Sequence, residues 1–101
     1  MLRNEFKEWL IDVKKLKENA ADDRVSNAEK VNKVYDLDKE YAKDKCKSLI
    51  KVLKYSTEDV RVGNPPKCDI IINGNYYTGL ATLRQAVYRY VEFLNSKSAT
   101  I

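Results

Sequence analysis

The side chains best suited to chemistry are cations and amides on two segments with helical periodicity. Lysine and arginine suit phosphate oxygens, asparagine and glutamine can read base edges, and an exposed tyrosine can stack on or hydrogen-bond to a nucleic-acid backbone. The candidates lie in residues 19–35 and 79–94 and are Asn27, Lys30, Lys33, Arg84, Gln85, Tyr88 and Arg89. Taken singly, such residues are most often parts of a solvated face. Convergence on one surface would make them a site.

Other kinds of chemistry lack the residues that they need. The chain has no histidine, which removes the commonest general base and the usual pairing of histidine with a serine or cysteine nucleophile. Cys46 and Cys68 match no zinc spacing, and no phosphate-binding glycine loop is present. The carboxylates Asp36 and Asp38 are better explained as helix caps than as a calcium loop. We therefore expect a non-enzymatic domain without a metal or cofactor.

Composition indicates a small folded domain of the cytoplasm. The 101 residues allow one core, and 44% hydrophobic with 34% charged residues favours a helix-rich, folded chain. A net charge of +4 is compatible with a polyanion partner but is ordinary for a soluble domain. No apolar run is long enough to cross a bilayer. The cysteine number permits a disulfide, but a buried thiol at Cys46 and an incidental one at Cys68 fit a reducing compartment better.

The element that must position most of the candidates is a helix over residues 79–94. Its apolar residues recur at three- and four-residue steps and cover a broad arc, so several other elements must wrap around it. Its other face carries candidate residues, which look outward from a rigid rod. We expect it to begin at Thr78 or Gly79 and to fray after Asn95.

Four further helices are predicted before this central one. Trp9 is expected at the centre of the first, and Asn19 is expected to cap the second. Residues 56–59 can begin one more helical turn. The predicted spans of the four helices are residues 3–16, 19–35, 37–43 and 44–55.

Strand character is confined to residues 60–77. Gly63–Pro66 ends any regular helix, because consecutive prolines lack amide donors and restrict the residues before them. Ile70–Ile72 is β-branched, and Asn73-Gly74 suits a tight type I′ turn. The second strand could come from either of two segments, Val60–Val62 or Tyr76-Tyr77.

These elements together define the predicted fold. We expect a mainly α protein, a four-to-five-helix orthogonal bundle with room for a small β-hairpin around residues 60–77. Residues 1–95 are predicted to form a single helical domain. Residues 96–101 have the composition of a tail or the start of a linker.

Three features of the sequence together resemble a known family. They are Phe6-Lys7-Glu8-Trp9-Leu10 opening a helix, a second helix beginning near Asn19, and a last helix reading Leu83-Arg84-x-Ala86-Val87-x-Arg89-Tyr90-x-x-Phe93-Leu94. In these the chain resembles the SAM-like, core-binding N-terminal domain of phage integrases and tyrosine recombinases, and similar modules stand at the N-termini of McrB-like restriction proteins. The likeness covers nearly the whole chain. It departs at residues 61–75, and the arginine–histidine–arginine set with its nucleophilic tyrosine is absent.

The resemblance implies a helical bundle that grips double-stranded DNA while a separate C-terminal catalytic or motor domain acts. The chain would then be the N-terminal part of a longer recombinase-like or restriction-type protein. In this interpretation Lys30, Lys33 and the candidates of the last helix contact phosphates, while Asn27 and Gln85 read base edges if any residue does.

A protein–protein interaction or oligomerisation domain is the alternative. Its apolar patch would be formed by Tyr88, Ile11 and the Tyr76-Tyr77 region. Salt separates the two functions, because DNA binding weakens steeply as salt rises and an apolar interface barely responds.

Overall fold

Six helices build the part of the chain that the structure describes. The computed structural model describes residues 1–99, with the side chains described as far as residue 97. Within this range the fold is mainly helical, as predicted, and contains no strand. The helices are α1 (Arg3–Asp12), α2 (Glu18–Asn32), α3 (Leu37–Asp44), α4 (Lys47–Val52), α5 (Thr57–Val62) and α6 (Tyr76–Ala99).

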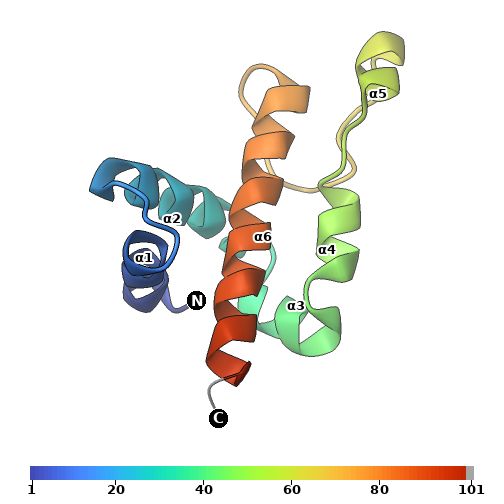
Figure 1. The fold of residues 1–101 in the computed structure, drawn as a ribbon. Helices are drawn as coiled ribbons and strands as arrows, with labels where there is room; N and C mark the ends of the chain where they lie inside the picture. The colour runs from blue at the N-terminus through green and yellow to red at the C-terminus, as the bar shows by residue number, and fades with distance from the viewer. Residues whose placement is uncertain (100–101) are drawn as a thin grey trace.

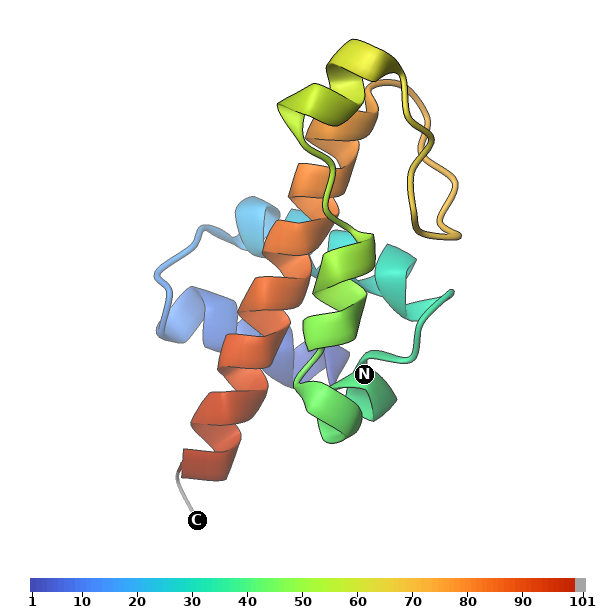
Figure 2. The same ribbon diagram turned by 90° about the vertical axis from the view of Figure 1, so that its right-hand side faces the viewer.

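Helix α6 is the element around which the others are arranged (Figure 1). Helix α2 crosses one side of α6 and makes the most extensive contact with it, and α1 packs beside α2. Helices α3 and α4 lie on the other side, where α4 runs alongside α6, and α5 sits at one end of the molecule (Figure 2). The central position predicted for the last helix is therefore confirmed.

Aromatic side chains of α1 and α6 meet at the centre of the core. Phe6 is fully buried, and its ring centroid lies 5.1 Å from that of Tyr90 and 5.6 Å from that of Phe93. Trp9, the residue predicted at the centre of α1, is half-buried and lies 5.8 Å from Phe93. Three residues turn a helix by about 300°, so Trp9 lies at the edge of the face that Phe6 presents to α6.

Side-chain caps fix where two of the short helices begin. Asp36 caps α3, as predicted, by accepting a hydrogen bond from the backbone N–H of Lys39 at 3.2 Å. Ser56 and Asp59 form a reciprocal capping box at the start of α5, which confirms the helical turn predicted there. The cap predicted at Asn19 is wrong, because α2 begins one residue earlier and includes Asn19.

The hairpin predicted over residues 60–77 is also wrong. Its first part belongs to α5, and residues 63–75 form a loop without a strand. The Asn75 side chain accepts a hydrogen bond from the backbone N–H of Thr78 at 3.1 Å and so caps α6. This cap draws the two following tyrosines into the helix, where they cannot serve as a second strand. Ile70 is buried against the core instead of pairing in a sheet.

The last helix is longer at both ends than predicted. It begins at Tyr76 instead of Thr78 or Gly79, and it continues past Asn95 to Ala99. The first four residues of the predicted tail are thus helical. Residues 100–101 of that tail lie outside the described residues.

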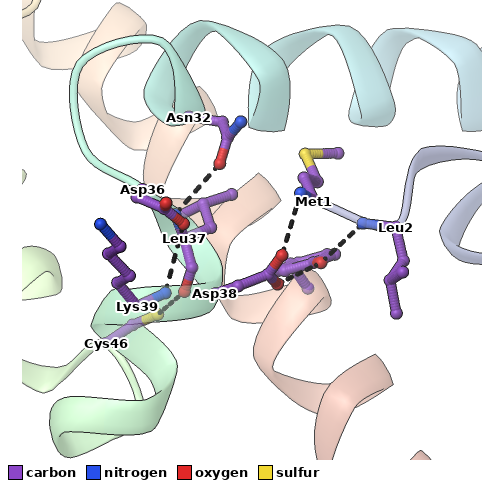
Figure 3. A network of polar contacts seen from close by, with 9 residues as sticks. Met1, Leu2, Asn32, Asp36, Leu37, Asp38, Lys39 and Cys46 are labelled. Carbon is purple, nitrogen blue, oxygen red and sulfur yellow. Dashed lines mark hydrogen bonds and ion pairs between the residues drawn. The ribbon is translucent and has the colours of Figure 1, made fainter.

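A buried hydroxyl joins segments from both ends of the chain. The hydroxyl of Tyr90 accepts a hydrogen bond from the backbone N–H of Leu2 at 2.9 Å and donates one to Asp38 at 2.7 Å. The other carboxylate oxygen of Asp38 lies 2.9 Å from the amino group of Met1 (Figure 3). Burial opposes the ionisation of Asp38, but the hydrogen bond from Tyr90 and the nearby amino group outweigh it, so the pKa of this carboxyl is lowered.

Replacing Ser56 with alanine is expected to loosen α5 while the rest of the domain stays folded. Helix α5 buries no residue, so it depends on its capping box, whose loss costs about 1 kcal/mol. Amide hydrogen exchange over residues 57–62 should accelerate by roughly fivefold, with little change in the urea midpoint. Thr57→Ala is the matched control because it leaves the box intact. Equal acceleration in both variants would contradict this account of α5.

Candidate nucleic-acid interface

A shallow groove follows the line where α2 crosses α6. Two adjoining hollows of about 280 and 330 Å³ lie along it, and Asn27 and Thr82 line both of them. Lys30 belongs to the first hollow, and Arg24 and Gln85 belong to the second. The groove therefore places two cations and two amides of α2 and α6 on one continuous surface.

The sequence of α2 brings the two helices close together. Its buried face is made of small residues that recur at three- and four-residue steps, namely Ala21, Val25, Ala28 and Val31. On α6 the side chains of Leu83, Ala86 and Val87 are buried as well. Small side chains at a crossing let the two backbones approach, so the polar residues on either side of the contact form the rims of a narrow groove. This narrow face of α2 agrees with its predicted periodicity.

The structure gathers three of the seven predicted site residues in this groove. They are Asn27 and Lys30 from α2 and Gln85 from α6. Lys33 is exposed farther along α2, where it lines a separate hollow with Arg3 and Glu29. The remaining three residues, Arg84, Tyr88 and Arg89, line neither hollow of the groove.

Arg84 and Tyr88 lie outside the groove, on the side of α6 that faces α4. The guanidinium of Arg84 donates a hydrogen bond to the backbone carbonyl of Leu53, just after α4, at 2.8 Å. Tyr88 follows four residues later in the helix and so lies on the same side, with 46% of its surface exposed. Arg84 therefore holds two elements together, which its sequence position did not reveal.

Arg89 is held by a carboxylate. Its guanidinium lies 2.6 Å from one oxygen of Glu92, and Lys14 lies 2.6 Å from the other oxygen. The hydrogen bond from Lys14, with that from Arg89, outweighs the burial of Glu92 and lowers the pKa of this carboxyl. The positive charge of Arg89 is thus partly neutralised by Glu92.

The cations in the groove have no ion-pair partner among the described residues. Carboxylates pair with cations of α1, α3, α5 and α6 and of the segment after α1, including Arg3, Lys7, Lys14, Lys43, Arg61 and Arg89. Within the described residues, Arg24 and Lys30 of α2 and Lys33 directly after it have no such partner. Their charges therefore remain available to an anionic ligand.

A second set of unpaired lysines lies across α6 from this groove. Helices α2 and α4 are on opposite sides of α6 (Figure 1). The lysines in and around α4 are exposed and lack ion-pair partners among the described residues: Lys45, Lys47, Lys51 and Lys54. Unlike the α2–α6 groove, this set lies on a single short helix and its flanks.

Sequence reasoning missed Arg24 and Thr82 as groove residues. Arg24 stands three residues before Asn27 in α2, so helical periodicity could have placed both on one face. Thr82 stands three residues before Gln85 in α6 in the same way. Asp23 was also missed, and it contributes a carboxylate to the second hollow.

Neither cysteine is placed for nucleophilic chemistry. Cys46 and Cys68 are both free and buried, as predicted for Cys46 but not for Cys68. The Cys46 thiol donates to the backbone carbonyl of Leu37 at 3.7 Å (Figure 3). Burial, with nearby carboxylates as smaller causes, raises the pKa of this thiol to about 12. It therefore stays protonated at neutral pH.

Comparisons with protein-family models, with curated proteins and with solved structures find no match to this chain. Among the described residues, no three histidine, cysteine, aspartate or glutamate side chains are grouped so that they could hold a metal ion. None of the helices in that range has the length and apolar character to cross a membrane.

Proposed function

We propose that this chain is a non-catalytic module that binds double-stranded DNA through the groove between α2 and α6. The observation that carries the proposal is the meeting of unpaired cations and amide side chains on one concave surface. Arg24 and Lys30 supply the charge, and Asn27 and Gln85 supply hydrogen-bonding groups between them. This combination suits a ligand that presents phosphates beside base edges.

The two kinds of side chain have different tasks in this proposal. The cations neutralise phosphates and release counterions, which gives affinity without sequence preference. Asn27 and Gln85 can each donate a hydrogen bond to a base edge and accept one from it. Lys33 extends the cationic edge of α2 beyond the groove. Arg84, by contrast, joins α6 to the residue after α4, and Arg89 is paired with Glu92 of its own helix.

A larger context is part of the same proposal. By its resemblance to core-binding domains, we propose that the module works beside a separate catalytic or motor domain in a recombinase-like or restriction-type protein. In that arrangement the groove positions DNA and another domain performs the chemistry. The resemblance supports this context, and the groove supports the DNA contact.

Charge reversal at Lys30 tests the proposal. Lys30→Glu is expected to weaken binding to a short labelled duplex by roughly tenfold, which corresponds to about 1.4 kcal/mol. It should also reduce the slope of log affinity against log salt by about 1, because one phosphate contact is lost. Fluorescence anisotropy at a series of salt concentrations measures both effects.

Lys51→Glu is the matched control for this experiment. Lys51 is an exposed, unpaired lysine of α4, on the opposite side of α6, and the charge change is identical. Its affinity should stay close to that of the unchanged protein. If Lys51→Glu weakens binding while Lys30→Glu does not, the groove is the wrong surface.

Removing the carboxylate of the groove should strengthen DNA binding, the opposite of the effect expected for Lys30→Glu. Asp23→Asn takes a negative charge out of the second hollow while keeping the size of the side chain. We expect roughly threefold tighter binding in the same assay, or about 0.6 kcal/mol. A gain that persists at high salt would be inconsistent with an electrostatic origin.

A protein-interaction role is the second candidate, favoured by exposed apolar residues. Val60 and Val62 of α5 are 52% and 54% exposed, on a helix that buries no residue. From the predicted patch, Tyr77 and Tyr88 are exposed, while Ile11 is half-buried and packs against the core. Binding to a partner protein through α5 should barely change with salt, in contrast to DNA binding.

A further inference from the structure

Ile71 projects from the surface more completely than any other large apolar residue of the described chain. Its side chain is 87% exposed, whereas the exposures of the other large apolar residues at the surface run from 38% to 57%. Exposed apolar residues are common on proteins, and most need no explanation. Ile71 is unusual because both of its neighbours are anchored.

The flanking isoleucines hold Ile71 in place from both sides. Ile70 is buried, and Ile72 packs against the core. Ile72 lies so close to α6 that a Cβ atom at Gly79 would meet its Cγ2 at 2.8 Å. Ile72 is therefore seated directly on the helix backbone, which only a glycine at this position allows. Ile71 must point away from the surface that its neighbours contact.

The loop is also tied to the segment that follows α2. The backbone N–H of Asp69 donates a hydrogen bond to the Tyr35 hydroxyl at 2.9 Å, and Cys68 before it is buried. These contacts fix the loop at points shortly before Ile71. Because the loop is already ordered, its apolar side chain can enter a partner without the entropic cost of ordering the loop first.

The surroundings of Ile71 are polar and cationic. It lines the same hollow as Asn27, Lys30 and Asn73, and the other apolar residues there are buried or packed against the core. A protein interface is normally built on a contiguous apolar patch, which is missing at this point. A single apolar tip beside lysine and asparagine has instead the composition of proteins that wedge open the minor groove.

We propose that Ile71 acts as an apolar wedge that enters the minor groove of duplex DNA and partly unstacks a base step. This inference rests on the proposed function and adds its binding mode. Lys30, in the same hollow as Ile71, and Arg24, in the adjoining one, would hold phosphates, and Asn27 would face the exposed base edges. The duplex bends away from the inserted side chain, and flexible steps such as TA are the easiest to open.

The experiment compares Ile71→Ser with the unchanged protein on a short duplex that carries 2-aminopurine at a central TA step. The unchanged protein should raise the fluorescence of 2-aminopurine, which increases on unstacking, and should bind a duplex with a central mismatch roughly tenfold more tightly than the matched duplex. Ile71→Ser should bind the matched duplex within about threefold of the unchanged protein at low salt, because the phosphate contacts remain. At saturation it should give no fluorescence rise and no preference for the mismatch.

Val60→Ser is the control, since it removes a half-exposed apolar residue of similar shape from α5. It should behave like the unchanged protein in both assays. If the unchanged protein binds DNA and responds to Lys30→Glu, yet Ile71→Ser gives the same fluorescence rise and mismatch preference, the wedge is overturned and the DNA-binding groove stands. If the unchanged protein binds no duplex at low salt, the proposed function fails and the wedge with it.

Discussion

Phe6→Ala is expected to lower the free energy of unfolding by about 3 to 5 kcal/mol, the usual cost of emptying an aromatic site in a core. Phe6 is fully buried, and its ring packs against those of Trp9, Tyr90 and Phe93. These neighbours come from two helices and cannot all collapse into the space that the ring leaves. A domain of this size has only about 5 to 15 kcal/mol of stability, so the variant should be close to unfolding.

Urea denaturation followed by far-ultraviolet circular dichroism measures this loss. Leu2→Ala is the control, because Leu2 precedes the same helix and is 38% exposed. Its cost should be below about 1 kcal/mol. A loss of less than about 1 kcal/mol for Phe6→Ala would mean that the aromatic cluster is not the main support of the fold.

Tyr90→Phe is expected to cost about 1 to 3 kcal/mol, although it removes a single oxygen atom. The ring of Tyr90 is fully buried, and its hydroxyl is the shared partner of the Leu2 N–H and of Asp38. The variant leaves the Leu2 N–H without that partner and removes a hydrogen bond from Asp38, whose side chain is 45% exposed. The same urea experiment measures the change.

The dependence of stability on pH in the acid range gives a second test of the hydrogen bonds around Tyr90. Asp38 has a lowered pKa in the folded protein, so its contribution is present above its unfolded pKa of about 3.9 and is lost as the pH falls through the folded value. Tyr90→Phe removes a hydrogen bond that lowers this pKa, so its stability should depend less steeply on pH in that range. Tyr41→Phe is the control, since its hydroxyl bonds to Asn95 at the surface. Identical acid profiles for Tyr90→Phe and the unchanged protein would exclude this role of the hydroxyl.

Sequence patterns predicted the structure correctly where it depended on the residues of one segment. The apolar arc after Gly79 predicted the central helix, and Asp36 and Ser56 marked the beginnings of two short helices. These signals are local, because a helix face or a cap involves residues only three or four positions apart. The prediction failed at residues 63–75, where the turn signal of Asn73-Gly74 competed with the cap that Asn75 provides for α6.

The candidate site was harder to predict because it depends on which charges meet. Helical periodicity placed Arg84, Arg89 and Glu92 on the outer face of α6, but it could not show that the carbonyl of Leu53 accepts a hydrogen bond from Arg84. Another partner of Glu92, Lys14, is distant in sequence. A cation is available to a ligand only if no such partner reaches it, and that depends on how the helices pack.

The position of α6 in the chain has a consequence for how the protein folds during its synthesis. Residues 76–99 are translated after the other five helices, yet they supply Tyr90 and Phe93, the surfaces on which Phe6 is buried. Until these residues leave the ribosome, α1 and α2 have nothing central to pack against, and their apolar faces stay open to solvent or to chaperones. Contacts of such long sequence separation slow folding, because a large loop must close before they form. The nascent chain therefore acquires its core in one late step instead of helix by helix.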